Sequence, residues 1–452
     1  MQTFSNNGSS NKKMDDLPGS IYSDSRDFHL KHKGKIEIVN KFPIENARDL
    51  SLAYTPGVAQ PCIDAVNNPE SACDTTAAKN TVIVFSDDSS VLGLGDLQGK
   101  YGAPMAGMHV MEGKAALFIA FGGVQAFPMC ADHSWCNTEE EKIQNLVNTV
   151  RTIAPGYGGI NLEDIKAPRC FEVERRLKDL HLGVPIFHDD QHGTAIVVTA
   201  GMTNAAKVAG KKLSDMSIVI NGAGAAGCAT ARMLINAGVG NIILVDRNGI
   251  INKNDAKTMV HVKDDGTGEH QLLAEMTNKT NRFGGLGDAL IGADAFVGVS
   301  APGVLKPEMI RTMADKSIIF AMANPTPEIL PELAVEAGAF IIATGRSDYP
   351  NQVNNVLAFP GIFKGALLAR APEITDEMKL VSVNALAGCV PSSELSTTNI
   401  LPKPFDDRIY VNAIADAVAE CASKKPSIGL KSKGLKDYNN GANGTPNLHL
   451  FK

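Results

Sequence analysis

The pattern of apolar and polar residues divides the chain near residue 190. From about residue 21 to 190, helical stretches alternate with short apolar runs such as TVIVFSD at 81–87 and KAALFIAFGG at 114–123. We interpret these runs as strands. Residues 138–153 place apolar side chains three and four positions apart behind Thr138 and an acidic first turn, which predicts an amphipathic helix. The first half is therefore predicted to be α/β.

After residue 190 the alternation of strand and helix becomes regular. The predicted order is strand 217–222, helix 225–238 and strand 241–247, followed by apolar runs at 293–300, 316–324 and 339–345. Strands alternating with helices at this spacing predict a doubly wound parallel sheet of the Rossmann-like kind. The prediction is thus a two-lobed α/β protein: a disordered tail at 1–20, an N-terminal substrate and metal domain at 21–190, a dinucleotide-binding domain with C-terminal helices at 191–425, and a flexible tail at 426–452.

Composition narrows the class of protein. A chain of 452 residues with 44% hydrophobic and 20% charged residues is globular, and it is long enough for two lobes with a small-molecule cleft between them. A net charge of -6 without a Lys/Arg stripe argues against a nucleic acid partner. The polar N-terminus and the absence of a run of about 18 apolar residues argue against a secretory signal and a membrane span. We expect a cytoplasmic protein, with an organelle signal left open.

Eight cysteines without a CxxC pair indicate reduced thiols rather than a disulfide framework or a zinc ribbon.

A glycine-rich motif follows the predicted strand at 217–222. Gly222, Gly224 and Gly227 form GxGxxG and open a helix that closes at Gly238. This arrangement allows a tight turn, a close approach to a pyrophosphate and close packing of helix on strand. A glycine-rich turn that only packs is the alternative. A second candidate, GLGDLQG at 93–99, is followed by Gly102, Pro104 and Gly107, which we expect to break a helix, so we assign it to a substrate-domain loop.

An acid about two dozen residues later supports dinucleotide binding, because Asp246 ends the next predicted strand, where it can bind the ribose 2′-hydroxyl of NAD. Arg247 beside it could instead meet the 2′-phosphate of NADP, so the choice between NAD and NADP stays open. The candidate cofactor-binding residues are Gly222, Gly224, Ala225, Ala226, Gly227, Asp246, Arg247, Ser300 and Asn324.

Two pairs of adjacent acids stand at the ends of short apolar segments: Glu163 with Asp164, and Asp189 with Asp190. Such carboxylates can supply hard oxygen ligands to Mg²⁺ or Mn²⁺. For either pair alone, a helix N-cap or a solvated turn is the alternative. His188 and His192 have the i, i+4 spacing of a zinc pair, but a structural role is favoured because the segment begins as a strand.

Tyr54 and Lys114 are candidate proton-transfer groups. Tyr54 precedes a Thr-Pro-Gly turn that would hold its ring on a fixed loop. Lys114 begins a predicted apolar strand, where partial burial would lower its pKa. An ordinary packed or surface role is the alternative for each residue.

Taken together, these segments resemble the malic enzymes, in the short form found chiefly in bacteria. The resemblance covers roughly residues 25–425 and rests on ordered motifs that include AYTPGVA, LGLGD, EGKAALF, PIFHDDQHGTAIV, GAGAAG and SDYPNQVNNVLAFPGI. It implies oxidative decarboxylation of L-malate to pyruvate and CO₂, with reduction of NAD⁺ or NADP⁺ and a requirement for Mg²⁺ or Mn²⁺. It also implies a homo-oligomer, with a dimer as the first expectation.

The resemblance assigns roles residue by residue. Glu163, Asp164 and Asp190 are the implied metal ligands, and Asp189 belongs to the proton network around the lysine. Lys114 is the base for the C2 hydroxyl, and Tyr54 protonates C3. Asn324 and Asn355 bind the substrate carboxylate, whereas Asn354 is a weaker candidate with a structural role.

The chain departs from the long-form enzymes at Ser90, where those enzymes carry an arginine before LGLGD. The cation that meets the second malate carboxylate is therefore open, with Arg346 or the metal as candidates. Two other functions also remain: malolactic chemistry, which releases lactate from the same site, and a dinucleotide sensor that binds without turnover.

Overall fold

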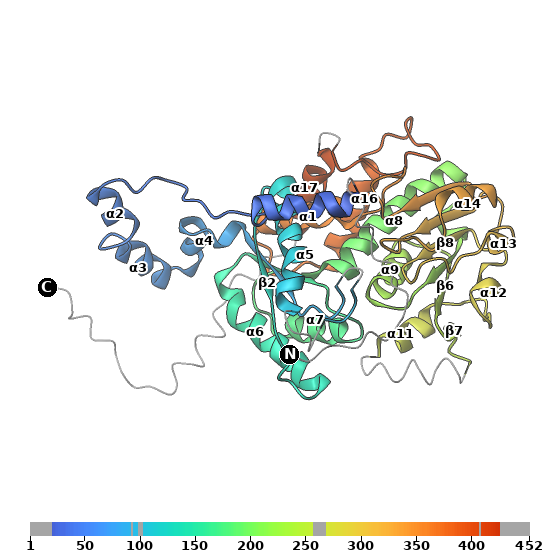
Figure 1. Cartoon of the computed structure of the whole chain (residues 1–452), viewed down its shortest axis with the longest axis horizontal. Coiled ribbons are helices and arrows are strands. Elements are labelled where there is room, and N and C mark those ends of the chain that lie inside the picture. Colours follow the sequence, from blue (N-terminus) through green and yellow to red (C-terminus); the bar gives the residue numbers. More distant parts are fainter. Residues whose placement is uncertain (1–19, 92–93, 98–102, 256–267, 406–407, 425–452) are drawn as a thin grey trace.

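The computed structural model describes residues 20–91, 94–97, 103–255, 268–405 and 408–424. Two sheets form its framework (Figure 1), with strand orders β2-β1-β3-β4 and β10-β9-β8-β5-β6-β7. Apart from the antiparallel pair β6–β7, neighbouring strands are parallel. The predicted α/β class with parallel sheets is confirmed. Apart from residue 20, the expected tails at 1–20 and 426–452 lie outside the described residues.

A helical segment precedes the first sheet. It comprises α1 (Ile21–His32), α2 (Ala47–Ala53), α3 (Ala59–Asn67) and α4 (Ala72–Thr75), with short 3-10 turns η1 (Pro69–Ser71) and η2 (Ala78–Asn80). None of the residues in α1–α4 is buried. Figure 1 shows α2 and α3 projecting to one side of the molecule, away from both sheets.

The first sheet and its helices span residues 81–188. The elements are β1 (Thr81–Ser86), α5 (Ala103–Leu117), the π-helical turn η3 (Phe118–Gly122), β2 (Gln125–Cys130), α6 (Glu139–Ile153), η4 (Ala154–Gly156), β3 (Gly159–Glu163), α7 (Arg169–Asp179) and β4 (Ile186–His188). All six residues of β1 are buried, because both faces of the sheet are covered. Ile83 and Phe85 pack in the core with α6 and α7, whereas Val82 and Val84 pack with α5 and α8.

The amphipathic helix predicted at 138–153 is confirmed as α6, and Thr138 caps it in a reciprocal capping box with Glu141.

Two expectations about the segment that forms α5 were wrong. The run that begins at Lys114 was predicted as a strand, but Lys114 lies near the end of α5, and η3 continues the helical path to Gly122. An apolar run cannot by itself distinguish a strand from a buried helix. Pro104 and Gly107 do not break this helix either. Pro104 lies in its first turn, where a proline is tolerated. The GLGDLQG segment falls partly outside the described residues.

The second sheet forms the dinucleotide-type half. Its elements are α8 (Asp189–Ala209), η5 (Leu213–Asp215), β5 (Ser217–Asn221), α9 (Ala225–Asn236), β6 (Asn241–Asp246), β7 (Gly249–Ile250), α11 (Glu269–Met276), α12 (Leu286–Leu290), β8 (Ala295–Gly298), α13 (Pro307–Ile310), β9 (Ile318–Ala321), α14 (Pro331–Glu336) and β10 (Ile341–Thr344). Every strand predicted after residue 190 is present. In this sheet β6 and β8 lie on opposite sides of β5. The chain therefore crosses over β5 between β6 and β8, which gives the doubly wound topology.

C-terminal helices join the two halves. They are α15 (Phe359–Leu368), α16 (Asp376–Gly388) and α17 (Ile409–Ser423), preceded by the turn η6 (Asn355–Leu357). One apolar core contains Val82 of the first sheet, Ile220 of the second and Phe363 of α15. The two sheets are therefore held together by a continuous core rather than by a loose linker.

The eight cysteines are free, as the sequence predicted. In the part of the chain that the structure describes, no helix has the length and apolar character needed to cross a membrane.

Candidate metal and dinucleotide site

The two acid pairs meet at one edge of the first sheet. Glu163 is the last residue of β3, and Asp190 lies in the first turn of α8, directly after β4. Because β3 and β4 are parallel neighbours, their carboxyl ends lie side by side. Oxygen atoms of Glu163, Asp164 and Asp190 all lie within 4.8 Å of one another. The sequence prediction that acids from two separate segments converge agrees with this geometry.

Asp164 is held in an uncommon backbone conformation. Its φ of 53° lies in the left-handed region, which Asp adopts more readily than most residues. The Asp164 N–H donates to Asp190 Oδ2 at 2.8 Å, and its carbonyl accepts the Ser90 N–H at 2.9 Å. These two bonds fix the turn that brings both acid pairs together.

Electrostatics make the cluster a fit for a divalent cation. Burial, and then the charges of Asp190 and Glu163, raise the pKa of Asp164 to about 9. Burial also raises the pKa values of Glu163 and Asp190. Oδ2 of Asp164 is buried and accepts no hydrogen bond. Three crowded carboxylates with such an orphaned oxygen form the hard oxygen donor set that Mg²⁺ and Mn²⁺ prefer.

Lys114 lies against this cluster. Its Nζ lies 2.6 Å from Asp189 Oδ2 and 2.8 Å from Glu163 Oε1, and all three side chains are buried. Burial alone would lower the pKa of Lys114, but the charges of Asp189 and Glu163 outweigh it and raise the pKa well above its ordinary value. The expected lowering of this pKa was therefore wrong. Burial raises the pKa of Asp189 to about 7.

The two histidines of this segment do not form a zinc pair. His188 ends β4, and His192 lies in α8 with Nε2 at 2.7 Å from Glu174 Oε1. Glu174 is buried on α7 and also pairs with Lys178 at 2.9 Å. His192 therefore links α8 to α7, in agreement with the structural role favoured from the sequence.

The glycine-rich loop lies between β5 and α9. Gly222 has φ 117°, and a Cβ there would lie 2.6 Å from the Val299 carbonyl oxygen. A Cβ on Gly227 would lie 1.7 Å from the Gly222 carbonyl oxygen. Gly224 caps α9 and has no atom within 4 Å of its Cβ position, and Ala225 and Ala226 form the first helical turn. The helix therefore begins at an open backbone surface suited to a pyrophosphate.

Asp246 ends β6, the strand next to β5. Its carboxylate accepts the Asn248 N–H at 2.6 Å and is partly exposed, whereas Arg247 is exposed. This is the location expected of an acid that binds a ribose.

Ser300 and Asn324 follow β8 and β9 at the same edge of the sheet. Ser300 Oγ accepts a hydrogen bond from Asn221 Nδ2 at 2.7 Å, which joins it to the end of β5. A buried residue that the sequence analysis missed, Glu328, accepts the N–H groups of Ser300 at 3.0 Å and Ala323 at 2.9 Å. Glu328 thereby holds both loops. Glu328 lies in the segment ANPTPEI at 323–329, and the sequence pattern of this segment does not show that the side chain is buried.

Asn355 lies close to the lysine network. A Cβ placed on Gly193 would lie 1.8 Å from Asp189 Oδ1 and 3.3 Å from Asn355 Cβ, so these two side chains face the same glycine. Asn354 instead caps η6 by accepting the Val356 N–H at 2.9 Å, in agreement with a structural role.

Arg346 is already engaged, because it forms a two-bond pair with Asp348 at 2.9 and 2.6 Å and donates to the Pro325 carbonyl at 3.2 Å.

Tyr54 is not brought to this cluster within one chain. It follows α2 and is 67% exposed. Figure 1 shows α2 to one side of the molecule, apart from α5, which carries Lys114. The candidate metal ligands and Lys114 therefore meet within one chain, whereas the segment that carries Tyr54 lies apart from them.

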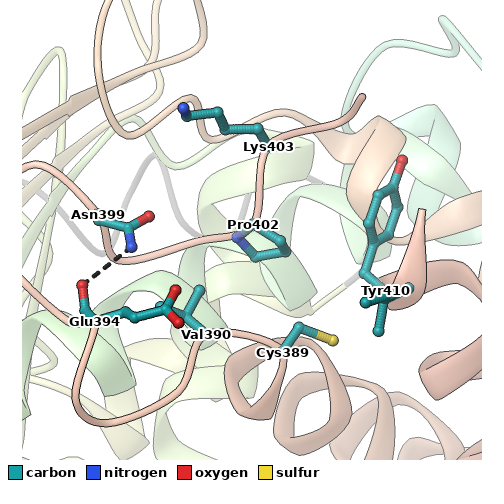
Figure 2. Close-up of a pocket in the computed structure, with 8 residues that line it drawn as sticks. Cys389, Val390, Glu394, Asn399, Pro402, Lys403 and Tyr410 are labelled. Carbon is teal, nitrogen blue, oxygen red and sulfur yellow. Dashed lines mark hydrogen bonds between the residues drawn. The ribbon is translucent and has the colours of Figure 1, made fainter. Parts of the chain in front are cut away.

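A separate cavity of about 370 Å³ lies between the end of α16 and the start of α17. Figure 2 shows Cys389, Lys403 and Tyr410 around it, with Asn399 bonded to the Glu394 carbonyl at 3.0 Å. None of the carboxylate cluster residues lines it. It is distinct from the site described above.

Comparisons with known proteins agree with this arrangement. Residues 33–178 match the family model "Malic enzyme, N-terminal domain", and residues 191–423 match "Malic enzyme, NAD binding domain". A NAD-dependent malic enzyme of Geobacillus stearothermophilus is 50% identical over 88% of this chain and 78% of its own length. A bifunctional malic/malolactic enzyme of Bacillus subtilis is 47% identical over 89% of this chain and 93% of its own length. The crystal structure of a NAD-dependent malic enzyme from Thermotoga maritima has a TM-score of 0.80 at 45% identity, covering 87% of this chain and 98% of that one.

Proposed function

This chain belongs to the malic enzyme family, and from that premise we propose that it catalyses the oxidative decarboxylation of L-malate. The products are pyruvate and CO₂, and NAD⁺ or NADP⁺ is reduced. The observation that carries the proposal is the contact of Lys114 with both Asp189 and Glu163. Through Glu163, a proton-transfer group is joined directly to a carboxylate cluster that fits a divalent cation.

Two groups supplied from solution would complete the site. Glu163, Asp164 and Asp190 would hold Mg²⁺ or Mn²⁺, and the backbone of Gly222–Gly227 with Asp246 would hold the dinucleotide. When bound, the cation supplies positive charge that stabilises the enolate oxygen formed as CO₂ leaves, and the nicotinamide accepts the hydride.

The residues of the chain handle the proton. Lys114 first passes one of its protons to Asp189 across their 2.6 Å contact, and the neutral amine then accepts the proton of the C2 hydroxyl. A cation held by the neighbouring carboxylates would offset the negative charges that raise the pKa of Lys114. The raised pKa of Asp189, about 7, suits it to this exchange near neutral pH. Asn324 and Asn355 orient the substrate carboxylate, which keeps the hydroxyl beside Lys114.

Tyr54 protonates C3 in this proposal, and a second copy of the chain brings it to the site. The N-terminal arm, defined as residues 38–67, exposes a series of large apolar side chains: Ile38, Val39, Phe42, Ile44, Leu50, Leu52, Tyr54, Ile63 and Val66. Short helices with no buried residue gain stability by packing against another surface. A homodimer in which each arm covers the partner molecule would bury this surface and place Tyr54 at the partner's lysine.

The test of the main proposal is direct. L-malate, NAD⁺ or NADP⁺ and Mn²⁺ should give NADH or NADPH together with pyruvate, and a chelator should abolish the reaction. Turnover that persists after chelation would contradict the role assigned to the carboxylates. Replacement of Asp190 by Asn should remove activity and Mn²⁺ binding together.

Malolactic chemistry is the second candidate, because the Bacillus subtilis relative bears both activities in its name. Release of lactate without accumulation of the reduced dinucleotide would identify it. A dinucleotide sensor would instead bind NAD⁺ without consuming malate.

The proposal also includes a cytoplasmic location and a division of the chain into two domains at residue 190.

A further inference from the structure

The loop that follows β1 contacts the Asp164 turn at two points. Ser90 donates its N–H to the Asp164 carbonyl at 2.9 Å. Two residues after Asp164, the Lys166 N–H donates to Ser89 Oγ, also at 2.9 Å. The backbone is therefore tied to this loop on the C-terminal side of Asp164, while the Asp164 N–H is tied to Asp190.

Ser89 is in turn anchored to a buried ion pair. Its hydroxyl donates to Asp87 Oδ1 at 2.5 Å, and its N–H donates to the same oxygen at 3.1 Å. The other Asp87 oxygen, Oδ2, accepts a hydrogen bond from Arg169 Nη1 at 2.5 Å. Arg169 also holds Glu139 through two bonds, at 2.5 and 2.8 Å.

This anchor is buried. Ser89 is 2% exposed, and Asp87 and Arg169 are each 1% exposed. A buried, hydrogen-bonded charge pair has few alternative arrangements, because breaking it leaves an uncompensated charge in the interior. The Ser89 hydroxyl therefore connects the buried Asp87–Arg169 pair, directly after β1, to the turn that carries Asp164.

Asp164 needs such support. A non-glycine residue in the left-handed region persists where its surroundings fix it. Its carboxylate must also stay beside those of Glu163 and Asp190 although their like charges repel. A loosened turn would let the carboxylate move away from the other two.

We propose that Ser89 is a positioning residue for Asp164, acting through its hydroxyl bridge from Asp87 to the Lys166 N–H. The inference rests on the proposed function, in which Asp164 is a ligand of the divalent cation. Ser89 is not among the residues proposed to hold the substrate or the cation, and its hydroxyl contacts Asp87 and the Lys166 N–H, so its loss should act on the affinity for the cation rather than on the chemistry.

The test is Mn²⁺ binding to the full-length protein without malate, followed by the electron paramagnetic resonance signal of free Mn²⁺. Ser89→Ala should weaken binding about tenfold, the lower end of the effect of residues that orient metal ligands. Turnover should recover toward the wild-type kcat at high Mn²⁺. Ser89→Thr keeps the hydroxyl and should bind Mn²⁺ more tightly than Ser89→Ala.

The matched control is Ser382→Ala. Ser382 is fully buried in α16, where its hydroxyl donates to the Met378 carbonyl at 2.7 Å. The Ser382→Ala variant should bind Mn²⁺ with the same affinity as the wild type. Wild-type affinity in Ser89→Ala, or equal weakening in Ser89→Ala and Ser89→Thr, would overturn the positioning role.

Asp190→Asn separates this inference from the proposed function on which it rests. If Asp190→Asn binds Mn²⁺ normally, the metal assignment itself fails. If Asp190→Asn loses binding while Ser89→Ala does not, only the role of Ser89 fails. Circular dichroism melts of each variant confirm that folded proteins are compared.

Discussion

Lys114 Nζ lies 2.6 Å from Asp189 Oδ2, a buried contact between residues 75 positions apart in the chain. Lys114 also contacts a second acid, Glu163. Glu163 belongs to the cluster of three carboxylates that could hold a metal ion, whereas Asp189 does not. The four acids therefore have two different tasks: Glu163, Asp164 and Asp190 suit a cation, and Asp189 suits the lysine.

Lys114→Ala should lower kcat for malate oxidation by on the order of 10²–10⁴, the usual contribution of a general base. Decarboxylation of added oxaloacetate should fall much less, because that step does not require loss of the C2 hydroxyl proton. Both rates can be measured in the same preparation, the first as NADH formation and the second as oxaloacetate consumption.

Lys364→Ala is the matched control, since Lys364 contacts Asn412 at the surface and should affect neither rate. An equal loss of both rates in Lys114→Ala would place the lysine in a different step.

Tyr54→Phe and Lys114→Ala should each be nearly inactive alone but active as a mixed dimer. If Tyr54 acts in the partner's site, a dimer with one chain of each kind contains one intact site. Co-expression with two different tags and purification through both isolates this species. It should show about half of the wild-type rate per dimer.

The control is a mixed dimer of Lys114→Ala and Asp190→Asn chains. Both substitutions affect residues that meet within one chain, so this dimer has no intact site and should stay inactive. An inactive dimer of the Tyr54 and Lys114 variants would contradict a shared site, as would failure to isolate a doubly tagged species.

The sequence predicted the parts of the site that follow strand ends. Glu163 ends a short apolar segment and Asp246 ends a longer apolar run, and parallel neighbours bring the ends of adjacent strands to one edge of a sheet. The candidate Lys114 lies in the buried network, but the strand predicted for it was wrong, because a short apolar run such as KAALF is compatible with a buried helix as well as with a buried strand. The sign of its pKa shift depended on Asp189, a contact across 75 residues.

Other residues left no pattern to find. Ser89 and Glu328 are polar residues in loops, and their burial results from how separate segments pack. The distance of Tyr54 from Lys114 within one chain could not be predicted either, because local sequence does not show where an arm of the chain projects.

Asp246→Ser should shift the cofactor preference toward NADP. The Asp246 carboxylate suits a ribose 2′-hydroxyl and repels a 2′-phosphate, so we expect the wild type to favour NAD. Loss of a charged hydrogen bond should lower kcat/KM for NAD about tenfold. Steady-state kinetics with both dinucleotides check this, and Asp255→Ser, on the loop after β7, serves as the charge-matched control. An unchanged ratio of the two kcat/KM values would exclude Asp246 from ribose recognition.

Asp88→Asn should stabilise the protein at neutral pH. Asp88 is 1% exposed and lies against α5, where a Cβ on Gly107 would come within 1.7 Å of its Oδ1. Burial raises the pKa of Asp88 to about 6, although contacts with the Cys130 thiol and Ser86 oppose this. Asn fits the φ of 56° at this position and carries no charge to bury.

The raised pKa of Asp88 determines how this carboxyl changes the free energy of unfolding with pH. The folded protein binds the Asp88 proton more tightly than the unfolded chain, whose carboxyl has a pKa of about 3.9. The stability from this carboxyl is therefore full below about pH 4 and is lost as the pH rises through about 6. At pH 8 the variant should exceed the wild type by at most about 3 kcal/mol in free energy of unfolding, the value that corresponds to a pKa raised from about 3.9 to about 6, and this difference should shrink toward pH 4.

Urea unfolding at several pH values, with a chelator present throughout, measures this difference. Asp348→Asn provides the opposite case, because the Arg346 pair lowers the pKa of Asp348 and removal of its charge should give no gain at pH 8. A stabilisation by Asp88→Asn that stays constant from pH 4 to 8 would show that packing, rather than the buried charge, separates it from the wild type. A loss of stability at pH 8 would show that the carboxylate makes a favourable contact that the amide cannot replace.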